Sequence, residues 1–520
     1  MRMVPLVLVT LAIFGVMVTS SVNITGPKPP SPSELKQQFG GKHVRSVDHA
    51  KLAALQKDFR SGRDVTEACL SCHTERHTEV MRSSHWNWSR MEFIPGRGIR
   101  AIGKKNVLNN FCIGVSDNQE GCSRCHAGYG MDDAAFDFKD PRNIDCLVCH
   151  DGSDTYAKGL AGMPLENLNL REIVQKVGPP KRTNCGGCHF YGGGGNNVKH
   201  GDLEQALLTG NRELDVHMAA DGGDLECTAC HRTKNHQMLG KLYSVSSMNR
   251  NRSTCEQCHT ATPHASGVLN NHGLKVACQT CHIPLYAKAS ETKVAWDWST
   301  AGKLRNGEPY EDENAAGNPV YASIKGDFTW ATNLKPDYVF FNGTAGHYLL
   351  GDKVPPQRPL EVNTLNGSYD DPDARITPVK IHRGKQIYDP ETNLMIQPKL
   401  FAKTTGEGGF WKDFNWQRAA EEGMKTAGLP YSGKYEFIDT VMYWPVNHMV
   451  APKEKALQCV ECHTPANSRM AGLKGFYMPG RDRNPFVESA GGLAIGLTAL
   501  GVLLHGLLRA VHAFRRRTVS

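Results

Sequence analysis

Cysteine is almost absent from this chain outside one repeated pattern. Of the 17 cysteines in 520 residues, only Cys112 lies outside sequences of the form Cys-x-x-Cys-His. A disulfide scaffold would not place a histidine after every second cysteine, and zinc sites couple such pairs to distant ligands, so neither interpretation is supported. The chain also has no basic run ahead of its last residues. Its formal net charge of +8 therefore does not indicate a nucleic-acid partner.

The repeated pattern is the attachment sequence of c-type haem. Its two cysteines form thioethers with the porphyrin, and the adjacent histidine becomes an axial ligand of the iron. Eight copies are far more than this composition would supply by chance, so the sequence predicts eight covalently bound haem c groups. The predicted attachment residues are Cys69, Cys72, Cys122, Cys125, Cys146, Cys149, Cys185, Cys188, Cys227, Cys230, Cys255, Cys258, Cys278, Cys281, Cys459 and Cys462. The predicted axial histidines within the motifs are His73, His126, His150, His189, His231, His259, His282 and His463.

A second axial ligand is needed by each haem that only transfers electrons, whereas a catalytic haem needs an open or displaceable position. Twelve histidines remain after those in motifs and two near the C-terminus are set aside. Histidines in short segments next to a motif are favoured, and His43 and His77 are less favoured. A surface or hydrogen-bonded histidine is the alternative for any one of them. The favoured distal ligands are His49, His85, His200, His217, His236, His264, His272 and His448.

Seven of the motifs are crowded into the 214 residues from Cys69 to His282. That is too little polypeptide to build a separate apolar core around each haem. We therefore predict a multihaem cytochrome c fold that is mainly α-helical and irregular, with a compact haem stack as its core and little sheet. Helices are expected at Leu52–Phe59, at Leu203–Leu208 with Asp202 as N-cap, and at Lys453–Gln458.

Composition divides the chain into six segments. Between Ile283 and Trp444 there is no haem motif, but six of the eight tryptophans lie there. We interpret this stretch as a lobe packed on the haem core. The predicted divisions are a signal peptide or signal-anchor at 1–25, a seven-haem domain at 26–290, the aromatic-rich lobe at 291–445, an eighth-haem segment at 446–485, a transmembrane anchor at 486–514 and a cytoplasmic basic tail at 515–520.

Two apolar segments, one near each end, predict the cellular location of the chain. Val4–Val18 follows Arg2 and is typical of a secretory signal, either cleaved or retained. Ala490–Leu508 is long enough to span a bilayer, and the arginines at 515–517 should stay on the cytoplasmic side. The haem-bearing part then faces the periplasm or cell exterior. His505 and His512 share one face of this predicted helix, and we interpret them as interfacial residues more readily than as ligands of a haem b or quinol site.

Cys112 lies ten residues before the second motif and has no partner within the sequence pattern. Taken alone, it is either an inert buried thiol or a functional one. However, the number and order of motifs, this lone cysteine, the stretch 191–203 and the stretch 342–352 resemble the octahaem tetrathionate reductase family. The resemblance covers about Asp48 to Pro479. The motif count alone is shared with octahaem hydroxylamine oxidoreductases and nitrite reductases.

The resemblance implies a catalytic site at the second haem, attached at the Cys122 motif and ligated by His126. In that family a lysine replaces the distal histidine, and a cysteine lies beside it. Carried over, the cysteine is Cys112 and the lysine is Lys199, with Lys181 and Lys234 as alternatives. The implied reaction is tetrathionate + 2 electrons → 2 thiosulfate. The C-terminal anchor departs from the soluble family pattern and leaves the electron donor open.

Three functions remain in competition on the sequence. The favoured one is a periplasmic respiratory reductase of a small inorganic oxyanion, tetrathionate foremost, with nitrite or hydroxylamine as other substrates. The second is a membrane-anchored electron conduit without its own substrate. The third is an oxidase of hydroxylamine or hydrazine. The expected partners are the membrane and a quinol-oxidising protein or another cytochrome as electron donor, and a homo-oligomer is left open.

Overall fold

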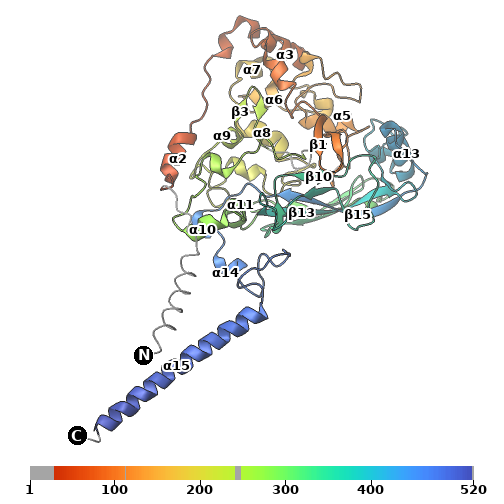
Figure 1. Cartoon of the computed structure of the whole chain (residues 1–520). Helices are drawn as coiled ribbons and strands as arrows, with labels where there is room; N and C mark the ends of the chain where they lie inside the picture. Colours follow the sequence, from red (N-terminus) through yellow and green to blue (C-terminus); the bar gives the residue numbers. More distant parts are fainter. Residues whose placement is uncertain (1–27, 112, 241–246, 518–520) are drawn as a thin grey trace. The chain divides into compact units, whose positions relative to one another are not determined.

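The computed structural model describes residues 28–111, 113–240 and 247–517 (Figure 1). The expected signal segment and Cys112 lie outside these residues. The chain separates into two compact units, one reaching to Ala456 and the other beginning at Leu457. The eighth motif therefore belongs to the second unit. The division into six segments remains a prediction.

The first unit begins with short helices joined by loops, and most motifs coincide with a single helical turn. A turn of this kind puts cysteines three residues apart on one side of the chain. The backbone N–H of His73, His150 and His231 donates to the carbonyl of the first cysteine of its own motif at 2.8, 3.1 and 2.9 Å. The α-helices of this unit are α2 (Pro32–Phe39), α3 (Gly62–Leu70), α4 (Arg76–Val80), α5 (Gln119–Cys122), α6 (Leu147–His150), α7 (Leu170–Gln175), α8 (Arg182–His189), α9 (Cys227–Cys230), α10 (Gly267–His272), α11 (Cys278–His282), α12 (Phe410–Asp413) and α13 (Trp416–Ala427).

The three expected helices are shorter than the sequence suggested. The first two are single 3-10 turns at Ala53–Leu55 and Gln205–Leu208, and the third is the turn Lys453–Lys455. Asp202 does not cap a helix. Its carboxylate instead accepts the backbone N–H groups of Asn447 and His448 at 2.7 and 2.9 Å. Long-range hydrogen bonds of this kind outweigh the weak helical preference of so short a segment.

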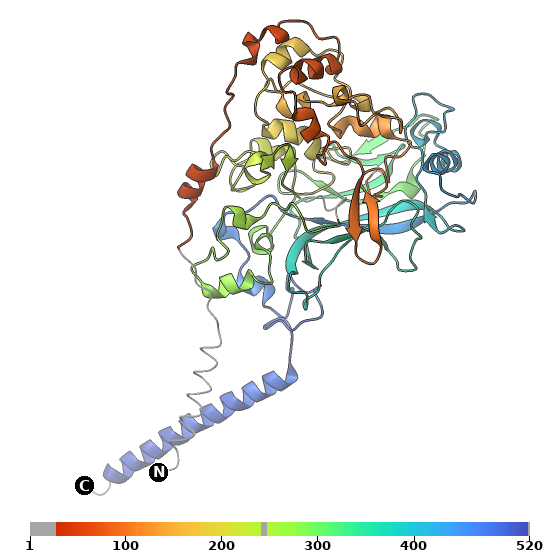
Figure 2. The same ribbon diagram turned by 45° about the horizontal axis from the view of Figure 1, so that its top comes forward.

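The expectation of little sheet is wrong. Nine strands form one sheet in the order β11-β15-β13-β5-β8-β7-β6, with β9 and β14 also paired to β13 (Figures 1 and 2). Its strands are β5 (Thr292–Asp297), β6 (Glu311–Glu313), β7 (Pro319–Ala322), β8 (Gly326–Ala331), β9 (Asp337–Phe341), β11 (Leu360–Glu361), β13 (Arg375–Asp389), β14 (Leu394–Met395) and β15 (Glu436–Pro445). The smaller sheets pair β1 (Arg90–Ile94) with β2 (Gly98–Ile102), β3 (Thr233–Lys234) with β4 (Gln237–Met238), and β10 (Ala345–His347) with β12 (Asn363–Leu365).

The sheet has its own apolar core, which explains why it forms. This part of the chain carries no haem motif, so its aromatic side chains must be buried against one another. The rings of Trp296 and Trp298 stack at 4.7 Å between centroids, and those of Phe410 and Trp416 stack at 3.8 Å. Strands present such a broad apolar surface more readily than short helices do. The prediction of little sheet extended the physics of the haem-rich segment to a segment that lacks haem.

The second unit contains α14 (Cys459–Cys462) and the long helix α15 (Pro485–Arg517). Within the described part of the chain, Pro485–Arg515 is one helix of 31 residues that is long and apolar enough to cross a membrane, with a mean hydropathy of 1.8 and none of its apolar window buried. The segment 486–514 predicted as an anchor lies inside this helix. Its length and composition suit a bilayer span.

Candidate functional site

Six motif histidines face a second histidine across a gap that fits one iron atom. An imidazole nitrogen binds a metal at about 2.0 Å, so two rings on opposite sides of one iron should have centroids roughly 6.3 Å apart. The observed separations lie between 6.1 and 6.5 Å. The side chains therefore fit haem c with two axial histidines. The pairs are His73 with His49, His189 with His85, His150 with His236, His231 with His448, His259 with His217, and His282 with His264.

Hydrogen bonds at Nδ1 leave Nε2 available in several of these rings. His150 Nδ1 lies 2.9 Å from the carbonyl of Gly178, and His231 Nδ1 lies 2.8 Å from that of Leu239. On the distal side, His236 Nδ1 lies 2.7 Å from a carboxylate oxygen of Glu79, and this bond is the main cause that lowers the pKa of Glu79. Partners of this kind fix the tautomer and the orientation of a metal-binding imidazole.

Two other predicted axial ligands are oriented in the same way, each within its own unit. His272 in α10 of the first unit has Nδ1 2.8 Å from the carbonyl of Val268. His463 in the second unit has Nδ1 2.7 Å from the carbonyl of Pro479. Each ring thereby directs Nε2 away from its own backbone, as an axial ligand requires.

His200 was expected as a distal ligand, but it is not part of the six pairs. Its ring instead makes an edge contact with Trp444, at 4.9 Å between centroids. Burial, followed by the charge of the adjacent Lys199, holds the pKa of His200 well below its ordinary value. Burial therefore favours the neutral form of this histidine.

Cysteines of different motifs lie close together. Their pairing gives the order in which the haem motifs follow one another in space. The nearness of a cysteine of another motif is the largest cause of a pKa shift in the thiols of the pairs Cys69 with Cys146, Cys125 with Cys188, Cys185 with Cys227, and Cys255 with Cys278. Cys149 also acts on the pKa of Cys188, and Cys258 acts on that of Cys230, so these motifs are neighbours too. The motifs therefore form a row in the order first, third, fourth, fifth, sixth and seventh. The second motif joins this row as a branch beside the fourth.

The second motif differs from the others in its geometry. The N–H of His126 donates to Ser123 at 2.7 Å, three residues back rather than four. Its ring lies in an aromatic cage made by Trp86, Trp88, Phe136 and Phe138, and burial lowers the pKa of His126 to about 3. Nε2 lies 2.8 Å from the carbonyl of Trp86, and Nδ1 has no hydrogen-bond partner in the described part of the chain. Within residues 28–111, 113–240 and 247–517, no second histidine ring pairs with His126.

A buried ion pair holds the backbone of this motif. Lys158 lies 2.9 Å from Asp145, and the two side chains are 4% and 0% exposed. The ammonium of Lys158 also donates to the carbonyls of His126 and Gly128 at 2.5 and 3.0 Å. Asp145 in turn accepts the hydroxyl of Tyr129 at 2.8 Å. The network links the second motif to the third, because Asp145 directly precedes Cys146.

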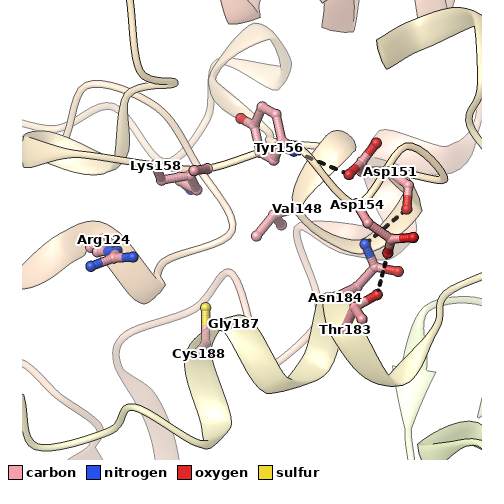
Figure 3. Close-up of a pocket in the computed structure, with 11 residues that line it drawn as sticks. Arg124, Val148, Asp151, Asp154, Tyr156, Lys158, Thr183, Asn184, Gly187 and Cys188 are labelled. Atoms are coloured by element: carbon pink, nitrogen blue, oxygen red, sulfur yellow. Dashed lines mark hydrogen bonds between the residues drawn. The ribbon is translucent and has the colours of Figure 1, made fainter. Parts of the chain in front are cut away.

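A cavity of about 130 Å³ opens between the second, third and fourth motifs (Figure 3). Lys158, Arg124 and Cys188 line it, together with Asp154. Lys181 was an alternative to Lys199 as the distal lysine. Its ammonium instead donates to Asp154 at 2.7 Å in a half-exposed ion pair, which favours a structural role for it. Lys234 is exposed on β3.

Lys199 lies near the second motif and against the sheet. Its Nζ is 4.8 Å from the ring centroid of Trp444. After the hydrogen bond to Cys188, the charges of Lys104, Arg124 and Lys199 are causes that lower the pKa of the Cys125 thiol. Three positive side chains therefore surround one edge of the second motif. A small anion would be attracted to this place.

Several residues around this site carried no signal in the sequence. Lys158 and Asp145 are ordinary charged residues until the fold buries them together. Lys380 and Trp444 lie in the strands β13 and β15, far along the chain from any of the first seven motifs. Only the unusual number of tryptophans in this segment pointed to a structural role for it.

The six histidine pairs predict the effect of removing one distal ring. We expect His236→Ala to convert a single low-spin haem to a high-spin form, because His150 would lose the ring that faces it at 6.3 Å. Electron paramagnetic resonance of the oxidised protein measures this directly. The matched control is His77→Ala, since His77 faces no motif histidine among the described residues. An unchanged low-spin signal in His236→Ala would contradict the pairing.

Comparisons with known proteins agree with this geometry. A family model described as bacterial cytochrome c matches residues 293–466. A protein of Archaeoglobus fulgidus, described only as uncharacterized, is 25% identical over 248 residues, which is 38% of this chain and 82% of the relative. The crystal structure of an octahaem cytochrome c from Shewanella oneidensis is similar with a TM-score of 0.76 and 42% identity, over 83% of this chain and 98% of that chain.

The similarity to the Shewanella protein extends over nearly its whole length, so it concerns the complete haem-bearing architecture and not one motif. Covalently bound haem c is accordingly the cofactor of this chain, and its general role is that of a multihaem oxidoreductase or electron-transfer protein. The chain belongs to the octahaem c-type cytochromes, as its resemblance to the octahaem tetrathionate reductase family predicted.

Proposed function

We propose that this chain carries eight haem c groups and reduces tetrathionate to two thiosulfates at the haem of the second motif. Bound haem iron supplies reversible one-electron storage and, at one position, a displaceable axial site. The remaining motifs, in the row described above, pass electrons toward the branch. Lys199 is the proposed distal ligand at that branch.

The observation that carries this proposal is the asymmetry of the second motif. Six other motif histidines each face a second histidine at 6.1 to 6.5 Å, whereas His126 faces none in the described part of the chain. Lys199 lies close enough to Cys125 for its charge to act on that thiol. A primary amine is more readily displaced from a metal than an imidazole that is fixed by a second hydrogen bond. We therefore infer that substrate enters at the branch. For haem to bind there, the His126 ring must exchange the contact of its Nε2 with the Trp86 carbonyl for the iron.

The surrounding charges suit a dianion. The positive charges of Lys104, Arg124 and Lys199 all lower the pKa of the Cys125 thiol, after the larger effect of Cys188. Oriented positive groups raise the local concentration of an anionic substrate and stabilise the charge of two anionic products. Nitrite would be attracted by the same charges, so attraction alone does not select the substrate.

Cys112 is the proposed nucleophile, and it accounts for a preference for a sulfur–sulfur bond. Its thiolate attacks one of the two central sulfurs of tetrathionate, releases thiosulfate and forms a Cys112–S bond to the other half. Two electrons then cleave that bond, which releases the second thiosulfate and restores the thiolate. Phe111, the residue before Cys112, packs against Trp444 at 5.8 Å, and Lys199 contacts the same ring. Phe111 and Lys199 therefore contact the same aromatic ring.

We place the haem-bearing part on the periplasmic face of the cytoplasmic membrane, anchored by α15. The helix is long and apolar enough, and Arg515 near its end favours a cytoplasmic C-terminus. An anchored reductase draws electrons from a membrane partner, so a quinol-oxidising protein or another cytochrome is the proposed donor.

The test is reoxidation of the chemically reduced, detergent-solubilised protein, followed through the haem absorption band. Rapid reoxidation by tetrathionate with thiosulfate as product is expected, and nitrite and hydroxylamine are run in parallel. Reoxidation by nitrite or hydroxylamine alone would move the enzyme to nitrogen compounds.

The electron conduit remains a second candidate, because the continuous row of motifs and the helix α15 would serve a wire equally well. A conduit predicts that all the haems have two strong protein ligands. No reoxidation by any of the three substrates would favour it.

A further inference from the structure

The backbone at Lys199 is hydrogen-bonded by a side chain from the nine-stranded sheet. Lys380 lies on β13 and is 0% exposed. Its ammonium donates to the carbonyls of Val198 and Lys199 at 2.8 and 3.1 Å and to the hydroxyl of Thr292 at 2.6 Å. An ammonium has three donors, so all three are used here. Lys380 therefore fixes the two successive carbonyl groups of Val198 and Lys199, and Lys199 is the candidate ligand.

Trp444 contacts the side chain of the same lysine. In the pairing of β13 with β15, Trp444 is directly opposite Lys380. Residues opposite one another in an antiparallel pair project from the same face of the sheet. Lys199 Nζ lies 4.8 Å from the Trp444 ring centroid, and the ring of His200 lies 4.9 Å from it. One cross-strand pair thus holds the backbone of Lys199 with one member and its side chain with the other.

Neighbouring contacts also restrain the loop that carries Lys199. The Thr292 hydroxyl that accepts from Lys380 donates in turn to the carbonyl of Asn197 at 2.6 Å. On the other side, Gly201 has a φ of +85°, and a Cβ there would lie 2.8 Å from the ring of Tyr286. The loop is therefore held on both sides of Lys199. The position of this lysine is set mainly by its backbone.

We propose that Lys380 and Trp444 are positioning residues that hold Lys199 at the haem of the second motif, and that the haem-free sheet exists partly to supply them. The inference rests on the proposed function, in which Lys199 is the distal ligand. When the lysine is off the iron, its contact with the ring of Trp444 would keep the side chain beside the site. Lys380 limits how far the lysine can move, so it returns readily.

The experiment uses the full-length, haem-loaded protein in detergent and the variants Lys380→Met and Trp444→Leu. The first readout is the paramagnetic resonance signal of the lysine-ligated haem in the oxidised protein. The second is the affinity for cyanide, which competes with the lysine for the iron. We expect both variants to lose most of the lysine signal and to bind cyanide about tenfold more tightly, while the signals of the histidine-ligated haems stay unchanged.

Three further variants make the result decisive. Lys385 lies five residues after Lys380 on β13 and so on the opposite face of the strand. The variant Lys385→Met should therefore leave both readouts unchanged. Trp444→Phe keeps an aromatic face and should fall between wild type and Trp444→Leu. If Lys380→Met does not accumulate with haem, Thr292→Val removes one acceptor of the ammonium and should show a smaller effect in the same direction.

Lys199→Met separates the two levels of the proposal. If it leaves the resonance spectrum unchanged, Lys199 is not the ligand, and both the ligand assignment and this inference fall. If Lys199→Met abolishes the lysine signal but Lys380→Met and Trp444→Leu behave like Lys385→Met, the proposed function stands and the positioning role is overturned.

Discussion

Replacing Cys112 by serine is expected to lower kcat/KM for tetrathionate by about 10³-fold or more. A hydroxyl is a far weaker nucleophile toward sulfur than a thiolate, and it cannot form the mixed disulfide through which the second thiosulfate leaves. The measurement is the rate of reoxidation of the reduced variant by tetrathionate under single-turnover and steady-state conditions. Reduction by dithionite, which only fills the haems with electrons, should be unchanged.

Nitrite and hydroxylamine provide the internal control for this variant. Their reduction needs an accessible haem but no thiol, so any activity toward them should survive Cys112→Ser. A variant that keeps most of its tetrathionate turnover would show that sulfur–sulfur cleavage does not pass through this cysteine. The proposed lysine-ligated haem would then have to act on the substrate without covalent help.

Replacing Lys158 by methionine is expected to cost about 3–5 kcal/mol of unfolding free energy. Asp145 is 0% exposed, and loss of the ammonium 2.9 Å away would leave a buried carboxylate without its counter-charge. The carbonyls of His126 and Gly128 would lose the same donor. Guanidinium unfolding of the solubilised protein, followed through the haem band and tryptophan fluorescence, measures the shift in midpoint.

The matched control for the buried pair is an exposed one. Lys181 and Asp154 form an ion pair at 2.7 Å with side chains 37% and 52% exposed. Solvent screens such a pair, and Lys181→Met should cost less than about 1 kcal/mol. Adding Asp145→Asn to Lys158→Met should recover part of the loss, because the unpaired charge is removed. Equal destabilisation by Lys158→Met and Lys181→Met would contradict the importance of burial.

The sequence by itself predicts where haem is attached. Attachment needs two cysteines separated by two residues and a histidine directly after the second, so the chemistry is complete within five residues. Nearness to a motif also gave the eight distal candidates. The structure brings six of the eight favoured histidines into ring pairs. Most of them face a motif other than the one beside them, as His85 faces His189 and His448 faces His231, so the fold and not nearness in sequence chose the partner. The resemblance to a known family was carried by patterns of the same local kind.

Features that depend on contacts between residues far apart in the chain were decided only by the tertiary structure. His200 met the same test of nearness, yet it packs on Trp444, a residue more than 200 positions away that no local pattern could bring to it. The sheet was missed because β13 is buried over most of its 15 residues and lacks the alternation that marks a half-buried strand. Lys380 and Lys158 are lysines like any other in the sequence. They acquire their roles because burial removes water and leaves their ammonium groups only protein oxygens to bind.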